Sequence, residues 1–160
     1  MFTVPAANPG GVATFADLAK PSVKGIAVPD PEKNSVGKHS IEALQSAGLW
    51  KQVEGKVIST TYAADSKELG EKGKADASMD YYPCVSEVHL PGQPPAAANG
   101  IKILLTPAAL YRPFSYEAAV IKGCGNPEGG KKLIAFLKTP EVQKLFTEWN
   151  FRRDLSEEHK

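Results

Sequence analysis

Residues 24–50 read KGIAVPDPEKNSVGKHSIEALQSAGLW, and this stretch decides the fold class. It opens with a short apolar run at 24–28, which prolines at 29 and 31 bring to an end, as is typical of a buried strand. From Gly37 onward, apolar residues recur at near-helical spacing until a glycine at position 48, namely Ile41, Leu44 and Ala47. The stretch therefore predicts a strand, a loop and a helix in that order.

The same alternation continues along the chain. We expect a strand at 57–62, a helix at 65–72 and a further strand at 75–81. Strands that alternate with helices at these lengths favour parallel βαβ units over a sandwich. We predict an α/β fold with a mainly parallel sheet flanked by helices, in which the buried strand residues are Ile26, Val28, Val57, Ile58, Ala77 and Met79.

Other elements surround this centre. The pattern predicts a short helix at 15–19, strands at 87–90, 101–105 and 116–122, a surface loop at 91–100, and two C-terminal helices. Each C-terminal helix begins with a capping residue followed by proline, at Asn126 and Thr139. The last helix carries an apolar stripe that must pack on something, formed by Val142, Leu145, Phe146 and Trp149.

Composition excludes several classes of function. The 160 residues are 42% hydrophobic and 23% charged with a net charge of +1, so no overall field attracts nucleic acid or an anionic membrane. The apolar runs are far shorter than the roughly 20 residues of a membrane-spanning helix. Residues 1–5 lack the basic and apolar regions of a secretory signal, as expected of a mature form or of a piece of a longer protein.

The residue types that catalysis requires are scattered. The three histidines, His39, His89 and His159, show no metal-binding spacing, and neither a nucleophile elbow nor a phosphate-binding glycine loop is present in the sequence. We expect no enzyme activity, no metal and no cofactor. Cys84 and Cys124 form one disulfide if the protein is exported, or remain two free thiols.

Two junctions where a strand runs into a helix are candidates for ligand binding. In open α/β sheets ligands bind at the carboxyl ends of strands, where helix N-termini suit an anion. The junctions are residues 34–37 and 62–66, and Tyr81 at the end of a third strand offers a phenolic hydroxyl. The alternative is that Ser35 and Asp65 only cap helices and that Tyr81 only packs.

The order of these motifs resembles the second lobe of molybdate-binding proteins of ABC importers, within the type II periplasmic-binding-protein fold. The resemblance covers roughly residues 4–151. It is carried by the runs FADLAKP at 15–21, IAV at 26–28, GKADA at 73–77, YRP at 111–113 and TPEVQ at 139–143. It implies a periplasmic or extracytoplasmic location, a membrane permease as partner, and a tetrahedral oxyanion such as molybdate or tungstate as ligand.

The resemblance also implies which residues bind. Backbone N–H groups around Ser35, Val36 and Gly37, those of Ala64 or Asp65, and the Tyr81 hydroxyl would hold the oxyanion. An acidic side chain at Asp65 would repel an anion if it pointed inward.

The family's first lobe, which supplies further hydroxyls, is largely missing from this chain. We accordingly predict a ligand-binding lobe with inter-lobe strands at 1–122, C-terminal helices belonging to the first lobe at 123–151, and a charged tail at 152–160. The two C-terminal helices either fold back on the α/β lobe or pair with a second copy to form a homodimer. The missing lobe predicts weak ligand binding, because one lobe surrounds only one side of the ligand. The alternative is a ligand-sensing domain of a transcription regulator, which a DNA-reading segment ahead of residue 1 would indicate.

Overall fold

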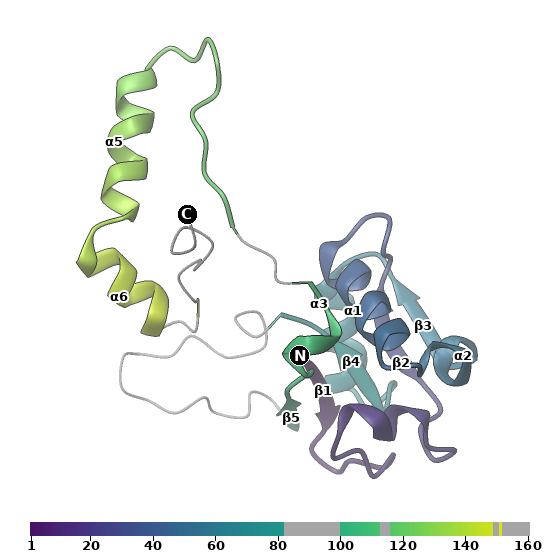
Figure 1. Ribbon diagram of the computed structural model, residues 1–160. Helices are drawn as coiled ribbons and strands as arrows, with labels where there is room; N and C mark the ends of the chain where they lie inside the picture. Colours follow the sequence, from purple (N-terminus) through teal and green to yellow (C-terminus); the bar gives the residue numbers. More distant parts are fainter. Residues whose placement is uncertain (82–99, 113–115, 149–150, 152–160) are drawn as a thin grey trace. The chain divides into compact units, whose positions relative to one another are not determined.

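The computed structural model describes residues 1–81, 100–112, 116–148 and 151 (Figure 1). The chain divides into two compact units, Met1–Pro113 and Phe114–Lys160, and each is described by itself. The predicted strand 87–90, nearly all of the loop 91–100 and the tail 152–160 lie outside the described residues. None of the helices within the described ranges is both long and apolar enough to cross a membrane.

A five-stranded sheet with the order β3-β2-β4-β1-β5 forms the centre of the first unit. Its strands are β1 (Phe2–Pro5), β2 (Ile26–Pro29), β3 (Val57–Thr60), β4 (Ala77–Met79) and β5 (Ile101–Leu104). β2 runs parallel to both β3 and β4, as predicted. β1 runs antiparallel to β4 and β5. The α/β class with a mainly parallel sheet is confirmed, because β2, β3, β4 and β5 run in one direction and β1 alone runs against them, between β4 and β5.

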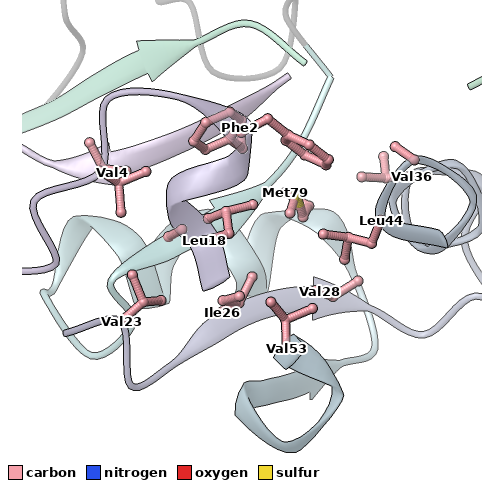
Figure 2. Close-up of a cluster of buried hydrophobic side chains, with 14 residues drawn as sticks. Phe2, Val4, Leu18, Val23, Ile26, Val28, Val36, Leu44, Val53 and Met79 are labelled. Atoms are coloured by element: carbon pink, nitrogen blue, oxygen red, sulfur yellow. The ribbon is translucent and has the colours of Figure 1, made fainter. Parts of the chain in front are cut away.

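The two faces of the sheet differ in chemistry. Alternate residues of a strand point to opposite faces. On one face, the strands contribute apolar side chains to the core together with α1 (Ser35–Ser46), α2 (Trp50–Val53) and a 3-10 helix at Phe15–Ala19. Figure 2 shows this cluster, in which Phe2, Ile26 and Met79 from the sheet meet Leu18, Leu44 and Val53 from the helices.

The other face is polar and small, and α3 (Ala63–Glu71) packs against it. The Thr3 and Ser78 hydroxyls lie 2.6 Å apart on neighbouring strands and are fully buried. Gly70 of α3 lies directly above them, because a Cβ at that position would come within 2.7 Å of the Ser78 Oγ. Glycine thus allows the helix to approach this face closely.

Burial follows the prediction in the inner strands. Ile26, Val28, Ala77 and Met79 are buried. Val57 and Ile58 are only partly buried, which corrects their prediction. They belong to β3, which is an edge strand and is therefore covered on fewer sides.

Among its described residues, the second unit contains two helices, α5 (Pro127–Leu137) and α6 (Pro140–Glu148). The predicted cap is confirmed at Asn126, whose Oδ1 accepts the Gly129 N–H at 2.8 Å. The predicted strand 116–122 is wrong, because this segment has no regular structure and no strand to pair with among the described residues of the unit. Phe151 makes edge-on ring contacts with Tyr116 and Phe146.

Candidate ligand-binding site

The candidate residues gather at one edge of the sheet. β2, β3 and β4 are parallel, so their carboxyl ends lie at the same edge. β2 leads into the start of α1, β3 into the start of α3, and β4 into Asp80 and Tyr81. The Asp30 N–H donates to the Thr60 carbonyl at 2.7 Å and joins the first two of these ends. The topology therefore brings the three predicted segments to one edge.

The start of α1 lies very close to the end of β2. A Cβ at Gly37 would overlap the Pro29 carbonyl, so only glycine fits there. Asn34, and not Ser35, is the capping residue, since its Oδ1 accepts the Val36 N–H at 2.8 Å. The Val36 side chain is buried in the core, and Ser35 is exposed. Any role of Val36 at this edge is thus through its backbone, whose N–H already has a partner.

The start of α3 carries its own negative charge. The Asp65 carboxylate accepts the Tyr62 N–H at 3.1 Å, and the Asp65 N–H donates to the Tyr62 carbonyl at 3.2 Å. Asp65 therefore caps the helix, as in the alternative given above. Ala64 and Asp65 are both exposed. A carboxylate here offsets the partial positive charge of the helix N-terminus.

Two buried hydroxyls that the sequence pattern does not single out hold the turn between β3 and α3. The Thr60 Oγ1 and Ser66 Oγ lie 2.7 Å apart, and Thr60 Oγ1 also donates to the Tyr62 carbonyl at 3.0 Å. Ser66 is fully buried. A threonine that ends a strand and a serine six residues later in the helix are the only traces of this contact in the sequence.

Asp80 is a further residue that the sequence reasoning missed. It is 3% exposed, and its Oδ1 accepts the Tyr81 N–H at 2.7 Å. Burial raises the pKa of Asp80 to about 6, against the opposing effects of the Tyr81 N–H, Lys67 and the chain's amino group. Tyr81 itself is half-buried and packs against the core.

A separate open hollow lies along α1 and contains none of the predicted site residues. Its volume is about 470 Å³, and its lining is Pro31, Lys38, His39, Ile41, Glu42, Gln45 and Arg112. Glu42 lies 3.2 Å from His39 Nδ1 and 3.6 Å from Arg112 Nε. Exposed ion pairs of this kind contribute little energy. The hollow is lined by both charge signs, and its lining runs from Pro31 and Lys38, near the start of α1, along that helix.

Other predicted groups give no further site. Within the described ranges, no three His, Cys, Asp or Glu side chains are placed to hold a metal ion. Cys124 is half-buried in the second unit, and Cys84 lies outside the described residues, so their disulfide stays a prediction. His89 and His159 also lie outside the described residues.

Two curated relatives are molybdate-binding proteins named ModA. The one from Rhodobacter capsulatus is 23% identical over 145 residues, which are 91% of this chain and 54% of the relative. The one from Escherichia coli (strain K12) is 27% identical over 127 residues, which are 79% of this chain and 45% of the relative. The chain thus spans about half the length of the curated relatives it matches.

Solved structures of other proteins share the fold of this chain. The periplasmic molybdate-binding protein of Azotobacter vinelandii superposes with a TM-score of 0.74 at 15% identity, over 96% of this chain and 64% of that one. These proteins are described as binding proteins and not as enzymes, in line with the prediction. A family model described as bacterial extracellular solute-binding protein matches residues 1–152. Because that match covers nearly the whole chain, the chain belongs to the family of bacterial extracellular solute-binding proteins.

Proposed function

We propose that this chain forms a ligand-binding lobe of the solute-binding component of an ABC importer, and that its ligand is molybdate, tungstate or a similar tetrahedral oxyanion. One observation carries the proposal: two helix N-termini and Tyr81 follow three parallel strands to the same edge of the sheet. The names of the relatives support the choice of ligand. The partner would be a membrane permease, and the location would be outside the cytoplasm.

Backbone groups supply most of the proposed contacts. The first N–H groups of a helix have no acceptor within it. At α1 these are the N–H groups of Ser35, Val36 and Gly37, and a charged oxyanion would replace the neutral Asn34 amide that now accepts from Val36. At α3 we assign the donor to Ala64, since the Asp65 N–H already donates to Tyr62. The Tyr81 hydroxyl completes the set.

The lobe surrounds only one side of such a ligand. Water competes from the other side, so we expect weak binding by this chain alone. The helices of the second unit present exposed apolar side chains, Leu133, Phe136 and Leu145, and have no buried residue. We propose that they pair with those of a second copy.

Calorimetric titration with molybdate, tungstate and sulfate tests the ligand and the role of Tyr81. We expect the wild-type chain to bind an oxyanion weakly and Tyr81→Phe to bind about tenfold more weakly, because one hydrogen bond to a charged acceptor is lost. Tyr116→Phe is the matched control, since Tyr116 is exposed in the second unit. It should bind as wild type does. Equal affinities of the two variants would contradict the role of Tyr81, and no binding of any of the anions would contradict the proposed function.

A further inference from the structure

Asp80 directly precedes Tyr81 in the chain, and several hydrogen bonds fix its position. It follows β4, it is 3% exposed, and its carboxylate accepts the Tyr81 N–H at 2.7 Å. Its main chain is also held, because the Asp80 N–H donates to the Met1 carbonyl at 3.2 Å and the Met1 amino group donates to the Asp80 carbonyl at 3.3 Å. Asp80 is thus held by its carboxylate and by its main chain, and its carboxylate lies in the interior next to a proposed ligand residue.

Few positive charges lie near the Asp80 carboxylate to stabilise its ionised form. α3 contributes Lys67 and Glu71, and β1 is preceded by the Met1 amino group. Lys67 Nζ lies 3.5 Å from Glu71 Oε1, so much of its charge is already balanced by Glu71. Within the described ranges, Asp80 has no ion pair within 4.0 Å of its own. A buried carboxylate without a close cation keeps a strong field around it, because little water screens it.

We propose that Asp80 selects the charge of the ligand at the candidate edge: its ionised carboxylate repels an oxyanion dianion next to Tyr81, and its protonated form admits it. This inference rests on the proposed function. Binding should therefore tighten as pH falls, and binding should in turn make Asp80 hold its proton more firmly, since the two equilibria are linked. The carboxyl group of Asp80 loses its charge near pH 6, because burial raises its pKa to about 6.

The test is calorimetric titration at about pH 6 and about pH 8, with sulfate beside molybdate because sulfate does not change its protonation in this range. Wild type should bind about tenfold more tightly at the lower pH. Titrations in buffers of different ionisation enthalpy should show proton uptake on binding. Asp80→Asn keeps an oxygen that can accept the Tyr81 N–H, and it should bind with equal affinity at both pH values and take up no proton.

Glu68→Gln is the matched control, because Glu68 is an exposed acid on α3 that is paired with Lys72. It should retain the wild-type pH dependence. Two results would overturn the role of Asp80 while leaving oxyanion binding in place: equal wild-type affinity at both pH values, or an unchanged pH dependence in Asp80→Asn. Absence of oxyanion binding in wild type and in Asp80→Asn at both pH values would instead remove the proposed function, and this inference with it.

Discussion

Asp80 shows at the scale of one residue how burial changes a side chain that the sequence alone presents as ordinary. Asp80 falls within the strand predicted at 75–81, but no local pattern in the sequence indicates that its carboxylate is buried. Its burial depends on α3 and on Met1, and Met1 is far from it in sequence. By contrast, the burial of Ile26, Val28, Ala77 and Met79 follows from local apolar runs. Residues placed by distant contacts are the ones that sequence reasoning misses.

The free energy of unfolding should reflect the raised pKa of Asp80. Its folded-state pKa of about 6 lies above the ordinary value of 3.8, so the folded state binds the proton more tightly. The resulting stability is fully present below about pH 4 and is lost as pH rises through 6. Asp80→Asn removes the charge, and we expect the variant to gain on the order of 2–3 kcal/mol over wild type at pH 8.

Urea unfolding of both proteins at about pH 8 and about pH 4.5 measures this effect. The gain should shrink at the lower pH, where wild-type Asp80 is largely protonated. A difference between the two proteins that stays constant across this range would show that the carboxyl group does not titrate as the structure indicates.

At the scale of elements, helix starts are largely encoded locally and strand pairing is not. The helices expected from Gly37 and Asp65 begin two residues earlier than predicted, at Ser35 and Ala63. β1 could not be predicted, because its four residues, which end in proline, are too few to show the alternation that indicates a strand. Conversely, residues 116–122 have a strand-like composition and form no strand, because a strand requires a neighbour. The candidate edge was predictable for the same reason as the helices: strand ends and helix starts are local signals.

The position of α1 depends on one glycine. Gly37→Ala would drive a methyl group into the Pro29 carbonyl and force the helix away from β2, and we expect it to lower the free energy of unfolding by about 2–4 kcal/mol. Gly55→Ala is the control, since nothing lies within 4 Å of a Cβ at that position. Its effect should stay within about 0.5 kcal/mol. Chemical denaturation compares the two, and similar losses in both variants would refute the close approach at Gly37.

At the scale of the whole molecule, the helices of the second unit carry apolar side chains that the unit itself does not bury. Leu133 and Phe136 of α5 are 57% and 58% exposed. The predicted stripe on α6 is only partly formed by described residues, because Trp149 lies outside them, while Leu145 is 47% exposed. The sequence predicts that these helices need a partner and cannot specify it, since the same apolar face suits a second lobe or a second copy.

Sedimentation analysis over a range of concentrations tests the proposed pairing. We expect the mass to rise toward that of a dimer with concentration, and Phe136→Glu to keep the chain monomeric because it places a charge in the apolar contact. Lys132→Glu alters the charge at an exposed position of the same helix and should leave association intact. A monomeric wild type at every concentration would exclude the pair.

The place of β1 between β4 and β5 also governs the order in which the chain folds. Thr3 and Ser78, which are bonded across β1 and β4, lie 75 residues apart in sequence, and β1 meets β5 further along still. Contacts of such long range slow folding, because a large loop must close before they form. On a growing chain, the two edges of β1 would have no partner strand until β4 and β5 had been made. Although β1 precedes the other strands of this unit, it is therefore among the last to be secured, and a chain that is stopped before β5 would leave one edge of this apolar strand open to association with other chains.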